Sequence, residues 1–246
     1  MRALGRRQLP ESILAAGARW ELIRTVKHDF FAATGFYRAA DGRDAVLKAS
    51  RTEPFAGVPL AWIGRWLCRR ELRFYEALAD LASVPAVVAR VDRHAFLHEY
   101  VPGRPLSREH PVPDGFFDEL QELMRELHRR RIAYVDANKP QNILLGDDGR
   151  PHLIDFQISW DLVELGDTWI NRWFLRRLQR ADLYHVLKHK KHMRPDEMTE
   201  RDWHEVSQRG FLIDLHRVVS KPYFKIRRRT FRRLRESGRI LPEGSE

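Results

Sequence analysis

One stretch in the second half of the chain, "DANKPQNILLGDDGRPHLIDFQ" at residues 136–157, restricts the fold of this sequence more than any other part. Two short apolar runs, "NILL" and "HLIDF", are separated there by the strong turn signal "GDDGRP". The pattern predicts a β-hairpin that brings Asn142, at the start of its first strand, close to Asp155, at the end of its second. Because Mg²⁺ prefers such amide and carboxylate oxygens, the hairpin ends are candidate metal ligands.

The preceding half of the chain predicts a small antiparallel sheet with one main helix. Three strand-like runs, "WELIRTVKH", "GFYRAA" and "RDAVLKAS", follow one another and are most simply joined as a meander. Residues 61–81 change to the apolar spacing of a helix, and "VPAVVARVD" and "AFLHEYV" return to strand-like patterns. The sequence "PGRPL" at 102–106 then breaks the chain and is the best candidate for a linker between two lobes.

The second half is mainly helical around the predicted hairpin. Residues 114–131 carry an apolar stripe at helical spacing, with Asp114 as a candidate N-cap. Further helical patterns follow Trp160, among them "DTWINRWFLRRLQRADLYHVLKH". An α+β fold of two lobes is therefore expected.

Lys48 lies inside the predicted strand "AVLKAS" with apolar neighbours on both sides. A buried ammonium is costly unless it is paired, so an acidic partner is expected. The helix at 61–81 offers Glu71 and Glu76, and Glu71 is the better candidate because it lies near the middle of the helix. Taken alone, however, Lys48 is more simply a lysine at a strand edge.

Asp136 follows a long predicted helix and precedes Asn142 by six positions. A carboxylate in such a loop can orient an attacking hydroxyl or accept its proton. Taken alone, Asp155 could equally cap a turn. The joint order of lysine, helical glutamate, Pro/Gly break, Asp, Asn and Asp is much harder to obtain by chance, and it supplies the groups that phosphoryl transfer requires.

With these residues the chain resembles the protein-kinase-like superfamily, particularly the compact bacterial lipopolysaccharide kinases of the Kdo/heptose kinase type and the related RIO-type kinases. "AVLKAS" resembles the strand that bears the phosphate-binding lysine, and "CRRELRFYEAL" resembles the helix whose glutamate pairs with it. "FLHEYVPGRPL" is similar to the interlobe hinge, "LHRRRIAYVDANKPQNILL" to the catalytic loop and "LIDFQ" to the Asp-Phe-Gly motif. The resemblance covers roughly residues 20–165.

The resemblance implies an ATP-dependent kinase of bilobal protein-kinase-like fold, with ATP and Mg²⁺ as cofactors. It implies an N-terminal extension at 1–20, an N-lobe with a small antiparallel sheet and one main helix at 21–101, a mostly helical C-lobe at 102–220 and a basic tail at 221–246. The implied catalytic residues are Asp136, Lys48 and Glu71, and the implied metal ligands are Asn142 and Asp155. The implied nucleotide-binding positions are Lys48, Gly35 in the phosphate loop, and the hinge backbone at Glu99, Tyr100 and Val101.

The chain departs from the family pattern in several places. Asp136 precedes Asn142 by six positions instead of five, "Tyr134-Val135" replaces the usual histidine, and Gln157 replaces the glycine after Asp-Phe. The phosphate loop "HDFFAATGFYRA" keeps only Gly35 of three glycines. A non-catalytic pseudokinase that acts as a binding module is therefore an alternative, although the required residue types at Lys48, Glu71, Asn142 and Asp155 favour an active enzyme.

The acceptor is expected to be a small molecule or a lipid-linked sugar, because no peptide-anchoring "APE"-like segment follows Asp155. A lipopolysaccharide-core sugar or a similar glycolipid is the favoured acceptor hydroxyl. An atypical serine/threonine protein kinase is the alternative.

The charge of the chain favours anionic partners: 44 Lys+Arg against 34 Asp+Glu give a net charge of +10. The tail at 221–246 begins with eight basic residues at 221–235 that alternate with aromatic and aliphatic ones, which suits an anionic membrane surface. A solvated terminal helix explains the tail equally well. Nucleic-acid binding is disfavoured, because no base-reading motif is found.

Cys68 is the only cysteine, which excludes an intramolecular disulfide and points to a reducing compartment. The first residues form a poor signal peptide, and no apolar run approaches the roughly 20 residues of a membrane span. We therefore expect a cytoplasmic protein that is either soluble or peripheral at the inner face of the cytoplasmic membrane.

Overall fold

A computed structural model of the chain describes residues 3–54 and 59–207. They fall into two units, Arg2–Met198 and a second that comprises Met1 and Thr199–Glu246. All elements named below belong to the first unit, and in the second unit residues 200–207 are helical. The basic tail at 221–246, on which the membrane prediction rests, lies outside the described residues.

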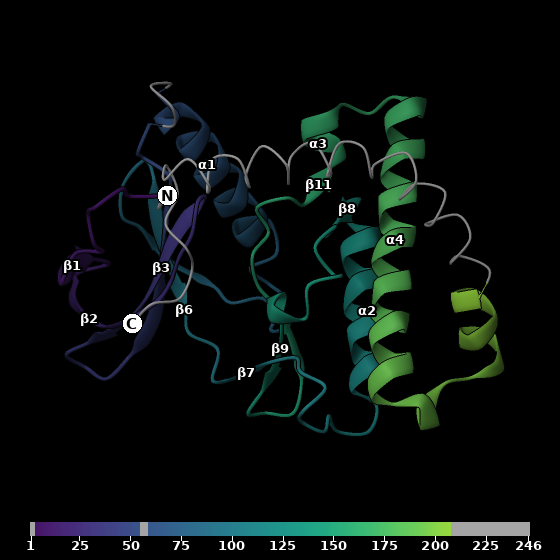
Figure 1. Ribbon diagram of the computed structural model, residues 1–246. Helices are drawn as coiled ribbons and strands as arrows, with labels where there is room; N and C mark the ends of the chain where they lie inside the picture. The colour runs from purple at the N-terminus through teal and green to yellow at the C-terminus, as the bar shows by residue number, and fades with distance from the viewer. Residues whose placement is uncertain (1–2, 55–58, 208–246) are drawn as a thin grey trace, which may run out of the picture. The chain divides into compact units, whose positions relative to one another are not determined.

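A six-stranded antiparallel sheet forms the N-terminal part, in the order β1-β2-β3-β4-β6-β5 (Figure 1). Its strands are β1 Ser12–Ala15, β2 Ala18–His28, β3 Ala32–Ala39, β4 Asp44–Ser50, β5 Val87–Arg90 and β6 Ala95–Glu99. The predicted meander is confirmed, since β2, β3 and β4 pair in sequence order. The first strand, β1, pairs with β2 and extends the sheet at its edge.

The two faces of this sheet are covered by different segments. Directly paired residues share a face of the sheet, so Lys48 shares one with Thr34 and Phe96, its partners on β3 and β6. Helix α1, Ala61–Ala77, packs on this face, where the rings of Tyr75 and Phe96 lie 5.6 Å apart. The opposite face is covered by the N-terminal segment through one buried cluster, which contains Leu9, Ile13, Trp20, Tyr37, Leu47 and Leu97.

The C-terminal part is mainly helical, with α2 Phe116–Arg129 lying alongside α4 Trp169–Met193 (Figure 1). The predicted hairpin is confirmed, because β9 Ile143–Gly146 pairs with β10 Pro151–Leu153. The candidate linker at 102–106 contains a third strand of this sheet, β7 Gly103–Pro105, which pairs with β9. The remaining elements are β8 Ile132–Ala133, η1 Pro140–Asn142, β11 Trp160–Asp161, α3 Leu162–Leu165 and η2 Pro195–Glu197.

The predicted N-cap of α2 was wrong. Gly115 occupies the cap position, where its φ of 74° suits a residue without a side chain, and no side chain caps the helix. The Asp114 carboxylate instead lies 2.8 Å from the guanidinium of Arg194.

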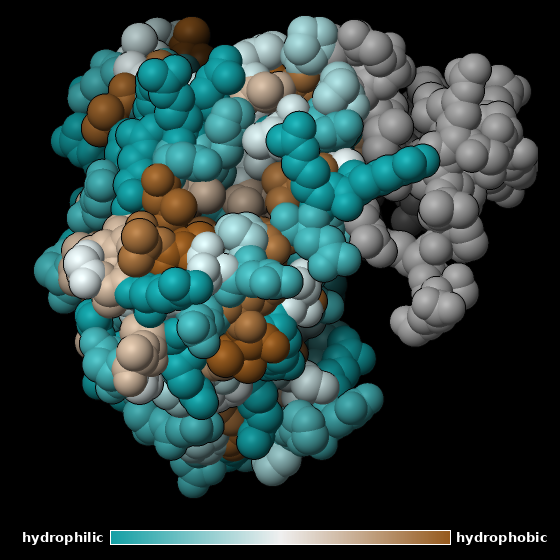
Figure 2. Space-filling view, turned by 90° about the vertical axis from the view of Figure 1, so that its left-hand side faces the viewer, coloured by the Kyte–Doolittle hydropathy of each residue, from teal (hydrophilic) through white to brown (hydrophobic). Residues whose placement is uncertain are grey.

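The outer surface over β1 and β2 carries several apolar side chains (Figure 2). Leu14, Ile23 and Val26 are exposed there, with Leu14 82% accessible. Within the described residues, no helix combines the length and the apolar character that a bilayer span requires.

Candidate active site

A buried ion-pair cluster links three segments that are far apart in the sequence. The ammonium of Lys48 on β4 lies 2.6 Å from a carboxylate oxygen of Glu71 on α1 and 2.7 Å from one of Asp155, which follows β10. Glu71 is fully buried and Lys48 is 8% exposed. The acidic partner predicted for Lys48 is therefore confirmed as Glu71, and Asp155 is a second partner.

The cluster shifts the pKa values of its members in different directions. Burial alone lowers the pKa of Lys48, but the carboxylates of Asp155 and Glu71 outweigh it and raise that pKa. Burial raises the pKa of Asp155, and the facing ammonium of Lys48 more than offsets this, so the pKa falls below the usual value. Burial dominates at Glu71, whose pKa rises to about 7 against the opposing effect of Lys48. Lys48 and Asp155 are consequently both charged at neutral pH.

Asp155 is held in an unusual backbone conformation. Its φ of 64° lies in the left-handed region, which costs a non-glycine residue about 1–3 kcal/mol and is concentrated at functional sites. The Asp155 amide donates to the hydroxyl oxygen of Tyr75, a buried residue on α1, at 3.1 Å. Tyr75 was not predicted as a site residue, because nothing in the helical pattern distinguishes it from other core aromatics.

A second cluster surrounds Asp136 in the loop between β8 and η1. One carboxylate oxygen, Oδ2, accepts hydrogen bonds from the side-chain amide of Asn142 at 2.7 Å and from the ammonium of Lys139 at 2.8 Å. The loop turns back through backbone bonds from Lys139 to Asp136 and from Asn142 to Lys139. The additional residue between Asp136 and Asn142 is thus accommodated without separating the two side chains.

Tyr134 connects the two clusters. Its ring is fully buried, and its hydroxyl lies within hydrogen-bond distance of the carbonyl oxygens of Asn142 and Ile154. It therefore spans from the Asp136 loop to the residue before Asp155. Through its hydroxyl, Tyr134 links these two segments.

Asp182 anchors the Asp136 loop from α4. Its buried carboxylate accepts hydrogen bonds from the backbone amides of Tyr134 at 2.8 Å and Val135 at 2.7 Å, and it lies 3.3 Å from the His128 ring. Val135 has a φ of 69°, which is a genuine outlier for a β-branched residue. Asp182 was not predicted as a site residue, although it is the sole acidic residue in the 25 residues of α4.

The segment after Asp155 is fixed to α1 by arginines. Arg70 donates to the carbonyl oxygens of Gln157 and Ser159 and forms an ion pair with Glu164 at 2.7 Å. Arg73 adds an ion pair with Asp161 at 2.7 Å. Gln157 therefore lies in a segment that is held against α1.

The predicted hinge residues Glu99, Tyr100 and Val101 lie at and beyond the end of β6. The amide of Glu99 donates to the carbonyl of Ala86, and that of Tyr100 donates to the carbonyl of Asp44. His98, just before them, is buried and its ring stacks on that of Tyr75, with centroids 5.2 Å apart.

Gly35 lies apart from the Lys48 cluster. It pairs with Leu47 inside β3 and so shares the opposite face of the sheet, where a Cβ would come within 2.6 Å of the Leu9 side chain. The turn between β2 and β3 is instead formed by residues 29–31, and the Asp29 carboxylate accepts from the amides of Phe31 and Ala32 at 2.8 and 2.9 Å. The structure thus gives Gly35 a packing role beneath the N-terminal segment.

The donor set suits a hard divalent cation such as Mg²⁺. Asp155 keeps its second carboxylate oxygen, Oδ2, outside the ion pair with Lys48, and its side chain is 29% exposed. Asn142 offers a side-chain amide next to Asp136, and its backbone carbonyl accepts a hydrogen bond from the amide of Ile154, the residue before Asp155. In the ranges 3–54 and 59–207, three or more His, Cys, Asp or Glu side chains nowhere gather into a metal-binding group. Mg²⁺ typically takes one or two protein ligands and completes its shell with water and phosphate.

Acid pH is expected to destabilise the fold through His98. Burial lowers the pKa of His98 from 6.5 to about 4, so between these pH values the unfolded chain binds the proton and the folded chain does not. Stability therefore falls as the pH falls through this window, by about 3 kcal/mol in total. Urea unfolding at several pH values should show a smaller pH dependence in His98→Gln than in the wild type. An equal pH dependence in the two proteins would contradict this origin, and the exposed His110→Gln serves as control.

Comparisons with known proteins show which fold this is. A scan against protein-family models and a search of curated proteins gave no match. Rio2 kinase from Chaetomium thermophilum, in its complex with ADP/Mg²⁺ and phosphoaspartate, matches with a TM-score of 0.54 and 18% identity over 72% of this chain and 57% of that chain. A second structure of Rio2 kinase from the same organism matches with a TM-score of 0.55 and 18% identity over 70% of this chain and 56% of that one.

The BubR1 kinase domain matches with a TM-score of 0.55 and 14% identity, over 77% of this chain and 66% of that domain. The chain thus spans less than two thirds of the length of each of these structures. At such identities the likeness concerns the fold. The predicted architecture is confirmed: the chain has a protein-kinase-like fold, with an antiparallel sheet and one main helix followed by a mostly helical part.

Proposed function

We propose that the chain is an ATP- and Mg²⁺-dependent phosphotransferase that moves the γ-phosphate of ATP to a hydroxyl acceptor. The observation that carries this proposal is the Lys48–Glu71–Asp155 cluster, with Lys48 held 2.6 and 2.7 Å from the two carboxylates. Phosphate transfer needs a lysine that contacts the phosphates, a carboxylate that keeps this lysine in position and a second carboxylate that can bind a cation. The kinase-like fold supports the same reaction.

In this proposal each cluster has one task. Lys48 contacts the α- and β-phosphates, and Glu71 keeps its ammonium in position. Asp155 and Asn142 hold Mg²⁺, which neutralises charge on the phosphates when it is bound.

Asp136 orients the acceptor hydroxyl and receives its proton, while Lys139, 2.8 Å from Asp136, faces the transferred group. The backbone of Glu99, Tyr100 and Val101 contacts the adenine between the proposed N-lobe at 21–101 and the C-lobe at 102–220.

We propose that the acceptor is a sugar hydroxyl that carries a nearby anionic group, as in a lipopolysaccharide-core sugar or a similar glycolipid. Only 13 residues separate Asp155 from the start of α4, and Arg70 and Arg73 already fix them, so little surface is left for an extended peptide. A basic group also lies beside the Asp136 loop. His189 on α4 bonds the carbonyl oxygen of Ala137 at 3.0 Å.

Positive charge surrounds that histidine. Burial lowers the pKa of His189, and the nearby charges of Lys188 and Arg108 lower it further. Arg108 is exposed and Lys188 is half-buried, and neither forms an ion pair with a residue in the described ranges. Unpaired cations next to the residue proposed to orient the acceptor favour an anionic substrate.

A binding module without transferase activity is the second candidate function. It is favoured by the turn between β2 and β3, where the Asp29 carboxylate occupies the amides of Phe31 and Ala32 that a nucleotide phosphate would otherwise approach. In an active enzyme the phosphate would have to displace that carboxylate, which costs binding free energy.

These assignments are tested by incubating the protein with γ-labelled ATP and a cell lysate. The lysate is then separated into lipid and protein fractions, and the label in each is measured. Label in the lipid fraction supports the glycolipid acceptor. Label in protein alone would replace this acceptor with a Ser/Thr side chain, as in an atypical protein kinase. Mg-ATP binding without transfer to either fraction would favour the binding module.

We also propose that the protein contacts an anionic membrane surface at the inner face of the cytoplasmic membrane. The starts of α1, α3 and α4 lie along one edge of the structure (Figure 1), and large apolar side chains are exposed on all three. Trp62 on α1, Val163 on α3 and Trp169 on α4 are 60, 83 and 77% exposed. Tryptophan favours the membrane interface, and the neighbouring Arg65 suits anionic headgroups.

Trp173, also on α4, is 58% exposed. Replacing Trp169 and Trp173 by serine is expected to weaken sedimentation with phosphatidylserine-containing vesicles about tenfold, because less apolar surface enters the interface. Leu14→Ser, which removes an exposed side chain from the β1–β2 surface, is the control. Unchanged vesicle binding in the tryptophan variant would contradict a contact through this edge.

A further inference from the structure

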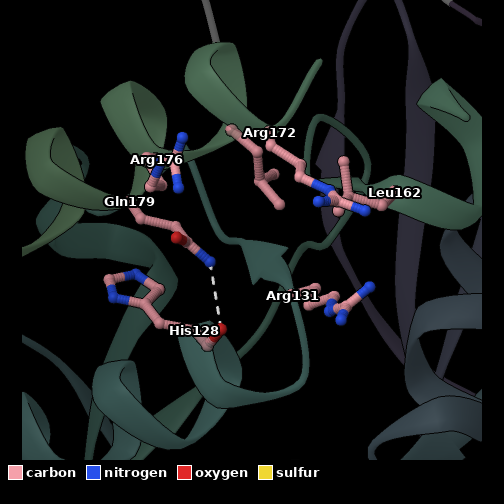
Figure 3. Close-up of a pocket in the computed structure, with 7 residues that line it drawn as sticks. His128, Arg131, Leu162, Arg172, Arg176 and Gln179 are labelled. Atoms are coloured by element: carbon pink, nitrogen blue, oxygen red, sulfur yellow. Dashed lines mark hydrogen bonds between the residues drawn. The ribbon is translucent and has the colours of Figure 1, made fainter. Parts of the chain in front are cut away.

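A cavity of about 240 Å³ lies between the end of α2, α3 and the first half of α4 (Figure 3). It is lined by His128, Arg131, Leu162, Arg172, Leu175, Arg176 and Gln179. None of these residues belongs to the Lys48 or Asp136 clusters. Four of the seven can carry positive charge, and none is acidic.

The charges around the cavity are only partly balanced. The guanidinium groups of Arg131 and Arg172 share one carboxylate, that of Asp167, at 3.1 and 2.5 Å. Two cations against one anion leave a net positive charge. Arg176 forms no ion pair with any residue in the described part of the chain, and Figure 3 shows its side chain beside that of Gln179.

The walls of the cavity are held in place by contacts within the fold. The Gln179 side-chain amide donates to the carbonyl oxygen of His128 at 3.2 Å (Figure 3) and to that of Ile132, also at 3.2 Å. Leu162 and Leu175 are buried and give the cavity an apolar side. The arginine side chains therefore lie around an open hollow that has buried leucines on one side.

We propose that this cavity binds a phosphate group, either as inorganic phosphate or as the monoester of a small molecule. Guanidinium groups match the geometry of phosphate oxygens and bind them with two parallel hydrogen bonds. The volume is below the roughly 300–1,000 Å³ that is typical of sites for drug-sized ligands, so a small phosphate is the fitting class. This inference is independent of the function proposed above.

Occupation of the cavity would act on the Asp136 loop through His128. The His128 ring lies 3.3 Å from the same Asp182 carboxylate that accepts the amides of Tyr134 and Val135. A phosphate bound in the cavity would restrict the His128 ring in its position next to this carboxylate. The ligand would thereby stabilise the loop that carries Asp136.

Titration calorimetry of the full chain without nucleotide, with inorganic phosphate and separately with glycerol 3-phosphate, tests the site. Arg176→Gln should weaken binding about tenfold, since it removes one charge-assisted contact. Arg177→Gln, an exposed neighbour on the same helix that does not line the cavity, should bind as the wild type does. Tighter binding of the ester than of phosphate would identify a monoester as the ligand, and the reverse would identify the free ion.

Two results would overturn the assignment. The first is the absence of binding at millimolar phosphate. The second is binding that survives in Arg176→Gln and is lost in Lys48→Met, because the phosphate would then occupy the Lys48 cluster. Hydrogen exchange tests the link to the loop: the amides of Tyr134 and Val135 should exchange more slowly with phosphate bound. Unchanged exchange in the bound state would refute that link.

Discussion

Asp155→Asn is expected to reduce transfer of phosphate from ATP by about a thousandfold, the scale on which a preorganised electrostatic contact acts. The substitution keeps the shape of the side chain and removes its negative charge. Lys48 retains its contact with Glu71 at 2.6 Å, so the positive group of the cluster stays in place. What is lost is the carboxylate proposed to hold Mg²⁺, whose partial exposure distinguishes it from fully buried Glu71.

Steady-state phosphate transfer and binding of a fluorescent ATP analogue, each measured over a range of Mg²⁺ concentrations, check this expectation. The variant should need much more Mg²⁺ for both, while its thermal unfolding should show that it is folded. Asp147→Asn is a matched control, because Asp147 lies in the turn of the same hairpin and is exposed. Near-normal transfer by Asp155→Asn at low Mg²⁺ would refute the metal assignment.

Local sequence patterns were sufficient for the elements that carry the site. The period-two runs and turn residues predicted the β2–β3–β4 meander and the β9–β10 hairpin, both of which form. The apolar neighbours of Lys48 implied a buried cation, and burial requires a partner, which is Glu71. In each case the residue types within one short segment were enough to predict its secondary structure or its burial.

Positions that depend on distant segments could not be predicted in this way. Gly35 lies near the expected phosphate loop in sequence, but strand register puts it on the face covered by Leu9. A shift of one residue changes the face, and the pattern around Gly35 did not show which face of the sheet it would occupy. The supporting role of Arg70 depends on α3, whose Glu164 is 94 residues further along the chain.

Asp182 is the residue whose loss should affect both stability and catalysis most strongly outside the two clusters. Its carboxylate is fully buried and accepts the amides of Tyr134 and Val135 at 2.8 and 2.7 Å. In Asp182→Asn the side-chain NH₂ cannot accept a hydrogen bond, so one buried backbone amide loses its partner. The free energy of unfolding should fall by about 3 kcal/mol, the cost of leaving such groups unsatisfied.

Catalysis should suffer beyond this loss of stability. Val135 is held at a φ of 69°, a conformation that a β-branched residue adopts only when its surroundings impose it. Without the second hydrogen bond the loop can relax, and Asp136, the next residue, moves away from Asn142 and Lys139. A displacement of about 1 Å lowers a rate roughly a hundredfold. We therefore expect kcat to fall by that factor with little change in the KM for ATP, because the Lys48 cluster is untouched.

Urea unfolding and steady-state kinetics at a temperature where the variant is folded separate the two effects. Asp114→Asn is the control, since Asp114 is exposed and Arg194 keeps Asp196 and Glu197 as partners. An Asp182→Asn protein that is less stable but has wild-type kcat would show that the anchor only supports the fold. A fall in kcat at full occupancy of ATP would show that the position of Asp136 depends on a single carboxylate in α4.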